Sequence, residues 1–224
     1  MYEHERLSPE KLYVLQLSWV NLMDRLGIQP APAYPLYDRL VAAYAEPHRH
    51  YHTLEHITEM LKILGKLGSG NRSLPILQLA VWFHDAVYDP KAQDNEEASA
   101  RMAEAELATL ELSPSDISRI RDLILATRHT PLAAISEEAA LLLDADLAIL
   151  GAEEKRYKRY SEAIRKEYAH VPEQEYVVGR MKVLESFLNR PSIYQTRLMK
   201  LEGEERARQN LQQEIADLTA KLAP

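Results

Sequence analysis

The sequence predicts an all-α fold, an HD-domain-like helical bundle with a C-terminal amphipathic helix, and three observations support the helical part of this prediction. Apolar residues recur at spacings of three and four through most of the 224 residues, which is the period of a helix buried on one face. Many of the expected helices begin at a serine, threonine or aspartate that can cap the first turn, often with a proline close behind. No segment shows a convincing strand pattern.

The first helix is expected to begin at Ser8-Pro9 and to stop at Gly27. Its buried face is a stripe of apolar residues, Leu12, Leu15, Trp19, Leu22 and Leu26. The stretch "PAPAYP", residues 30–35, is expected to be a linker before a short helix. Thr53 is expected to cap the next helix, which carries an apolar stripe and ends near Gly68.

The most apolar segment, "ILQLAVWFHDAVY", is expected to be a helix buried on nearly every side that opens at Ser73-Leu74-Pro75. Asp94 and Ser113-Pro114 begin the two helices after it. Further helices are expected over about 136–150, 153–169, 172–189 and 192–222. The last one carries a stripe that would pack on the domain or on a second subunit in a homodimer, formed by Leu211, Ile215, Leu218 and Leu222.

Composition and charge limit the function. A chain of 224 residues is long enough for one well-cored domain and short for two, so we expect a single domain over 1–224. The net charge of -7 argues against an extended nucleic-acid partner and against an anionic membrane surface. Without a membrane-length apolar stretch or a signal peptide, a cytoplasmic location is expected. Because the sequence has no cysteine, any metal must be held by His, Asp or Glu.

Histidines are concentrated in "HRHYHTLEH", residues 48–56, which holds four of the eight in the chain. His52 and His56 are four residues apart, so they lie on the same side of the first turn of the expected helix. His56 also neighbours the apolar stripe, so its ring can reach inward. His48 and His50 are expected to be solvent-exposed loop residues.

Three acidic residues interrupt apolar segments. An ionised Asp85 beside His84 in a buried helix would be costly unless it were paired or bound a cation. For the dipeptide alone, the alternative is a surface-facing pair at a helix end. Asp144 and Asp146 interrupt "LLLDADLAIL" in the same way. Because residues two apart point to different faces of a helix, only one of these two is expected inside.

Four of these residues follow one another in a fixed order on successive expected helices: His56, then His84-Asp85, then Asp146. The set resembles the HD superfamily of metal-dependent phosphohydrolases, which is all-helical and named for its His-Asp dyad. "YHTLEHI" is similar to a motif of cyclic nucleotide phosphodiesterases. "FHDAVYDP", "DNEEASA" and "DADLAILG" resemble a group of small bacterial predicted HD phosphohydrolases. The motifs cover about 45–150, which leaves 151–224 as C-terminal helices.

The resemblance implies roles for the matching residues. His56, His84, Asp85 and Asp146 would bind a divalent metal ion, and His52 would give a proton to the leaving oxygen. Two imidazoles and two carboxylates suit Mn, Fe, Co, Ni or Zn better than Mg. A metal-activated water would then hydrolyse a small phosphate ester, with nucleotides among the candidates. The phosphodiesterases carry a further histidine and a glutamine clamp that are not found here, so a cyclic nucleotide is not expected.

Five other residues are secondary candidates. Glu96 and Asp89 would serve proton transfer or support the metal, with helix capping and solvation as the alternatives. Arg49, beside the start of a helix, would help to bind phosphate. Arg128 and His129 would also contact phosphate, and His129 could complete a second metal site. The alternative for Arg128 is a cation that satisfies the last carbonyls of a helix.

A second class of function stays open at this point. A helical sensor or interaction protein could keep the same fold and bind a metal or nucleotide as a signal without catalysis. The complete ligand set favours an enzyme, because a binding module would need neither open metal positions nor a placed proton donor.

Overall fold

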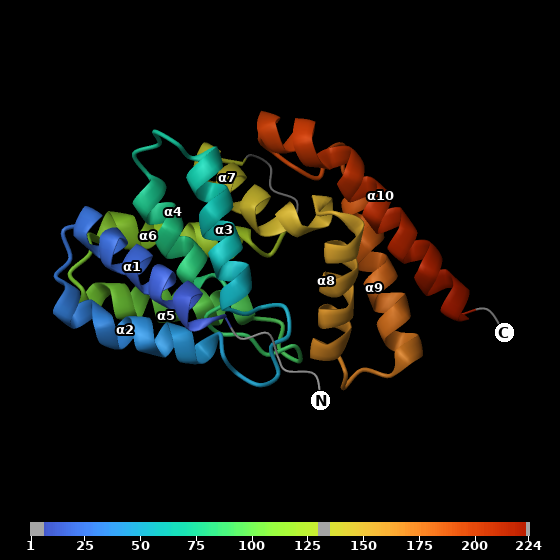
Figure 1. Ribbon diagram of the computed structural model, residues 1–224, viewed down its shortest axis with the longest axis horizontal. Helices are drawn as coiled ribbons and strands as arrows, with labels where there is room; N and C mark the ends of the chain where they lie inside the picture. Colours follow the sequence, from blue (N-terminus) through green and yellow to red (C-terminus); the bar gives the residue numbers. More distant parts are fainter. Residues whose placement is uncertain (1–6, 130–134, 223–224) are drawn as a thin grey trace. The chain divides into compact units, whose positions relative to one another are not determined.

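All of the regular structure is helical in the computed structural model, which describes residues 7–129 and 135–222 (Figure 1). Ten α-helices and one short 3-10 helix occur in these ranges, and they contain no strand. The prediction of an all-α fold is therefore confirmed. Within the same ranges, no helix combines the length and apolar character that crossing a membrane requires.

The chain divides into two compact units, Met1–Ala145 and Asp146–Pro224. The boundary lies close to residue 150, where the C-terminal helices were expected to begin. It separates Asp146, the last residue of the helix Glu137–Asp146, from the rest of that helix, which belongs to the first unit. The single domain over 1–224 stays a prediction.

The first unit is built from α1 to α7. Their bounds are α1 Pro9–Arg25, α2 Pro30–Ala43, α3 Leu54–Leu67, α4 Leu74–Phe83, α5 Asn95–Thr109, α6 Pro114–Ala126 and α7 Glu137–Asp146. The side chains of Ser8, Thr53 and Ser113 each accept a hydrogen bond from a backbone N–H two or three residues further on. These bonds satisfy N–H groups that have no partner inside the helix. The expected starts of α1, α3 and α6 are therefore confirmed.

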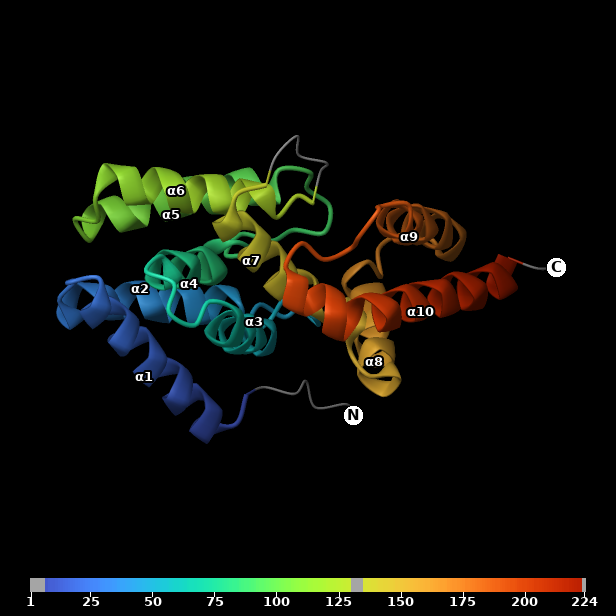
Figure 2. The same ribbon diagram turned by 90° about the horizontal axis from the view of Figure 1, so that it is seen from above.

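Helix α4 forms the centre of the first unit. It packs against α1, α3, α5 and α6, and Figure 2 shows it between α6 and α1. Its Trp82 is completely buried and meets Trp19 edge to face, with ring centroids 5.2 Å apart. The Tyr44 hydroxyl donates a hydrogen bond to the Trp82 carbonyl over 3.0 Å. This packing fixes the end of α4, where His84 and Asp85 follow.

The linker expected at residues 30–35 is wrong, because α2 begins at Pro30 and runs through this stretch. The first-turn N–H groups of a helix have no partner within it, so Pro30 and Pro32 remove no hydrogen bond there. Pro35 is the one proline of α2 that lies beyond the first turn. Burial of Ala33 and Leu36 holds the segment against the core.

The second unit contains η1 (Leu147–Gly151), α8 (Glu154–Glu167), α9 (Glu173–Leu188) and α10 (Arg197–Leu222). Helix α10 packs on η1 and α9. The Asn210 side-chain amide donates to the Leu150 and Ala152 carbonyls over 2.8 and 2.9 Å, which ties α10 to the segment after Asp146.

The C-terminal helix begins at Arg197 and not near residue 192. Leu211 and Leu218 of its predicted stripe are buried in the second unit, whereas Leu222 is exposed. Part of the stripe therefore packs on its own unit, and a homodimer stays a prediction.

Candidate metal centre

The centre of the site is a pair of buried histidines from two helices. The Thr53 cap starts α3 so that His56 lies in its first turn and points inward with Ile57. His84 caps the carboxyl end of α4. The Nε2 atoms of His56 and His84 are 3.3 Å apart. Two ligands at about 2.1 Å from one metal ion would lie about 3.0 to 3.4 Å apart for bond angles between square and tetrahedral.

The hydrogen bonds of His84 decide which of its ring nitrogens can bind a cation. Its Nδ1 is 2.9 Å from the Val81 carbonyl oxygen. A carbonyl oxygen only accepts, so we assign the proton to Nδ1, and the neutral ring keeps its lone pair at Nε2. Such a bond from the second ring nitrogen is common for metal-binding histidines.

Asp85 lies in the turn after α4, and its Oδ2 is 3.0 Å from the Nε2 of His84. A carboxylate oxygen only accepts, and the facing Nε2 offers a lone pair, so a proton or a metal ion between the two atoms would stabilise this approach. The side chain of Asp85 is 15% exposed and that of His84 is 1% exposed. The alternative of a surface-facing pair at a helix end is therefore correct about the helix end. It is wrong about the surface, because His84 is buried.

Asp146 is the last residue of α7 and joins the two histidines. One ligand atom each from His56, His84 and Asp146 lies within 4.8 Å of the others, so this group could hold a metal ion.

The expectation that only one of the two aspartates in α7 lies inside is confirmed, but the buried one is Asp144 and not the ligand candidate Asp146. Asp144 is completely buried, whereas Asp146 is partly exposed although it belongs to the histidine group. Every residue of α7 from Leu141 to Ala145 is buried, so Asp144 lies in the apolar part of the helix, whereas Asp146 ends the helix.

His52, the expected proton donor, lies in the turn before α3 and reaches the same place. Its Nε2 is 3.9 Å from Asp85 Oδ2, and its side chain is 19% exposed. The rings of Tyr51 and Tyr88 lie on it at centroid distances of 5.1 and 4.3 Å. His48 is exposed, as expected, and its Nε2 is 2.9 Å from the Tyr88 carbonyl oxygen.

Arg49 does not form the phosphate-binding group that we expected. Its side chain is 0% exposed, and four of its five N–H groups already have acceptors. These acceptors are the carboxylate of Glu46 and the backbone carbonyls of His52, Asp85 and Ala86. The guanidinium therefore links the segment before α3 to the turn after α4.

The other candidates lie outside the group of ligand atoms. The exposed Asp89 accepts a hydrogen bond from the Lys91 backbone N–H over 2.9 Å, which stabilises a turn. Arg128 follows the end of α6 and forms ion pairs with Glu97 and, at 4.0 Å, with Glu96. His129 has a positive φ of 54°, a conformation unusual for a residue other than glycine.

Sequence reasoning missed the two tyrosines of the site. Tyr51 directly precedes His52, and Tyr88 follows the His-Asp dyad within the same short motif. Their closeness to the motif was the available signal, although only the fold brings the two rings onto His52.

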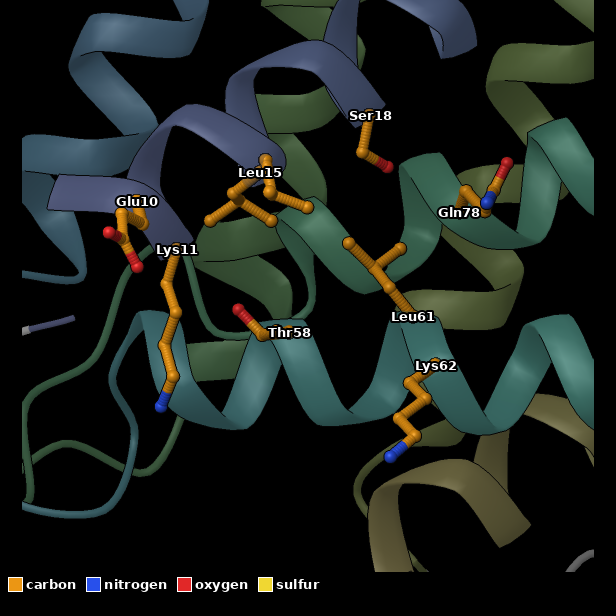
Figure 3. A pocket seen from close by; sticks show the side chains of 9 residues that line it. Glu10, Lys11, Leu15, Ser18, Thr58, Leu61, Lys62 and Gln78 are labelled. Carbon is orange, nitrogen blue, oxygen red and sulfur yellow. The ribbon is translucent and has the colours of Figure 1, made fainter. Parts of the chain in front are cut away.

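A separate hollow in the first unit lies between α1, α3 and α4 (Figure 3). Leu15 and Leu61 point into it from α1 and α3, and Lys11 and Lys62 lie along its rim. None of the predicted site residues lines it, so it is distinct from the histidine group.

Comparison of the chain with protein-family models, with curated proteins and with solved structures found no match. The functional interpretation therefore depends on the geometry of the site and on the resemblance of its motifs.

Proposed function

We propose that this chain is a metal-dependent phosphohydrolase of the HD type that acts on a small phosphate ester. The observation that supports this proposal most is the crowding of acceptor atoms around the Nε2 of His84. His56 Nε2 and Asp85 Oδ2 lie 3.3 and 3.0 Å from it, and Asp146 joins the same group. Such a cluster of lone pairs is stabilised by a cation.

His56, His84 and Asp146 would hold the metal, and Asp85 would complete the set of two nitrogen and two oxygen ligands. This donor set favours Mn, Fe, Co, Ni or Zn over Mg, which prefers oxygen ligands and water. When bound, the ion would polarise a phosphoryl oxygen and make a bound water more acidic.

The chain's own residues would supply proton transfer and positioning. His52 would hold a proton at Nε2 and give it to the departing oxygen of the ester. The Asp85 carboxylate Oδ2 lies 3.9 Å from this Nε2. The rings of Tyr51 and Tyr88 restrict rotation of the His52 side chain.

The proposal is tested with metal-free protein resupplied separately with Mn, Co, Ni, Zn or Mg and incubated with nucleotides and sugar phosphates. We expect phosphate release with at least one transition metal and less with Mg. A His84→Ala variant is the control for contaminating phosphatases. Binding of metal without turnover of any ester would instead support the non-catalytic sensor, and absence of metal binding would contradict both functions.

A further inference from the structure

Arg49 joins two segments that are far apart in the sequence. Its Nη1 donates to the Asp85 carbonyl over 2.6 Å and to the His52 carbonyl over 3.4 Å. Its Nη2 donates to the Ala86 carbonyl over 3.2 Å. One guanidinium group thus binds the turn that leads into α3 and the turn that leaves α4.

The surroundings of Arg49 keep this group in one orientation. Its Nε donates to Glu46 over 3.0 Å, and its guanidinium carbon lies 5.1 and 5.4 Å from the ring centroids of Tyr44 and Tyr88. The side chain is 0% exposed, so water does not compete for its donors. A planar fork with several fixed donors is suited to holding carbonyl groups that point in different directions.

The two turns carry the functional side chains. His52 and the ligand His56 lie at the start of α3, and His84 and Asp85 lie at the end of α4. A change in the spacing of the turns would therefore change the His56–His84 and His52–Asp85 distances together.

We propose that Arg49 is a positioning residue that sets the spacing of these two turns and so preorganises the metal ligands and the proton donor. The catalytic part of this role, positioning of the proton donor, rests on the proposed function. It differs from binding of the substrate phosphate, because the Arg49 donors already bind backbone carbonyls.

The test compares Arg49→Lys with Arg208→Lys in the full chain. Arg208 is a matched control, because its Nε also binds a glutamate, Glu204, and its remaining nitrogens donate to the Leu188 and Arg190 carbonyls. All of these contacts lie within the second unit. Lysine keeps the positive charge in both variants but lacks the fork of donors.

Two measurements are made, Mn²⁺ affinity by calorimetry and amide hydrogen exchange of the metal-free protein by mass spectrometry. Arg49→Lys is expected to weaken Mn²⁺ binding by about tenfold or more, as for other residues that orient ligands. It should also speed exchange in peptides 50–56 and 84–88 together. Arg208→Lys should leave Mn²⁺ affinity and both peptides unchanged and speed exchange near residues 188–192.

Wild-type Mn²⁺ affinity in Arg49→Lys, or faster exchange in only one of the two peptides, would overturn the positioning role. If the wild-type chain binds none of Mn, Co, Ni and Zn, the proposed function loses its support, and the exchange of the two peptides still decides whether Arg49 couples the turns. If Arg49→Lys does not fold, Glu46→Gln loosens the same guanidinium from an exposed position. It should weaken Mn²⁺ binding less but in the same direction, and unchanged affinity would count against the role.

Discussion

The Nε2 atoms of His56 and His84 lie 3.3 Å apart, although the two side chains come from the start of one helix and the end of another. With the His84 proton assigned to Nδ1, its Nε2 can accept one hydrogen bond from His56 or bind a metal ion beside it. The same atom also lies 3.0 Å from a carboxylate oxygen of Asp85. The pair could therefore hold a metal ion together with Asp146.

Replacement of either histidine should remove most of the bound metal. His56→Ala or His84→Ala removes a proposed ligand, so we expect elemental analysis to show strong loss of Mn or Co after loading. The helical far-ultraviolet signal should persist. His48→Ala is the matched control, because this exposed histidine lies in the same stretch and should leave the metal content unchanged. Full metal content in both ligand variants would rule out the assignment.

Replacement of the two aspartates of α7 should have different effects: Asp146→Asn should mainly lower Mn²⁺ affinity, and Asp144→Asn should mainly change the free energy of unfolding. Asp146→Asn weakens a ligand of the histidine group, so Mn²⁺ affinity should fall more than in Asp144→Asn. Asp144 is completely buried, so its replacement should mainly change the free energy of unfolding. Calorimetric binding and thermal unfolding of both variants separate these effects. The opposite order of affinities would show that Asp144 is the ligand.

The sequence was sufficient to predict most helices, because capping residues and apolar periodicity are local signals. Ser8, Thr53 and Ser113 each cap the helix that they were expected to start. The stretch 30–35 was misinterpreted because its prolines suggested a linker, whereas burial of Ala33 and Leu36 stabilises a helix there. That stabilisation comes from packing against distant residues, which a local pattern does not contain.

The site shows the same difference between local and distant information. The motifs were sufficient to select His56, His84 and Asp146, which the fold brings together. The environment of Arg49 was not predictable, because its acceptors include carbonyls more than thirty residues away. The position of Arg49 beside a helix start suggested phosphate binding. In the folded chain its N–H groups instead donate hydrogen bonds to backbone carbonyls.

Glycines 203 and 179 should respond oppositely to replacement by alanine. A Cβ at Gly203 would lie 3.0 Å from Cε2 of Tyr194, which is completely buried and cannot yield easily. We expect Gly203→Ala to lower the free energy of unfolding by about 1 to 2 kcal/mol, since overpacking outweighs the gain in helix propensity. At Gly179 the added atom meets nothing within 4 Å, so Gly179→Ala should stabilise by about 0.5 to 1 kcal/mol. Denaturant unfolding measures both changes, and equal effects would contradict the packing of Tyr194.

The second unit should lose stability in acid through Glu204. Burial alone would raise the pKa of its carboxyl, but hydrogen bonds from the Ile193 and Tyr194 backbone N–H groups, from Ser192 and from Arg208 bring it below the ordinary value of 4.5. A carboxyl whose pKa is lower in the folded state contributes stability above the unfolded pKa. This contribution is lost as the pH falls from about 4.5 through the folded pKa.

Glu204→Gln is therefore expected to be less stable than the wild type at pH 7 and to lose less stability on acidification below pH 4.5. Glu205→Gln, an exposed neighbour on the same helix, serves as the control and should follow the wild-type curve. The measurement is the free energy of unfolding as a function of pH. Parallel curves for Glu204→Gln and the wild type would show that the carboxyl contributes nothing to the acid sensitivity.

His52 should matter to the chemical step and not to metal binding. If it protonates the leaving oxygen, His52→Ala should lower kcat by about 10² to 10⁴ while metal content and KM stay nearly unchanged. The loss should be large for an alkyl phosphate, whose leaving group needs a proton, and small for a nitrophenyl phosphate, whose leaving group departs with little protonation. His48→Ala is the control, because His48 is exposed and contacts the Tyr88 carbonyl instead of Asp85. Equal losses on both esters would make His52 a positioning residue, and loss of metal would make it a ligand. In either case the proton donor would have to be sought at Glu96 or Asp89.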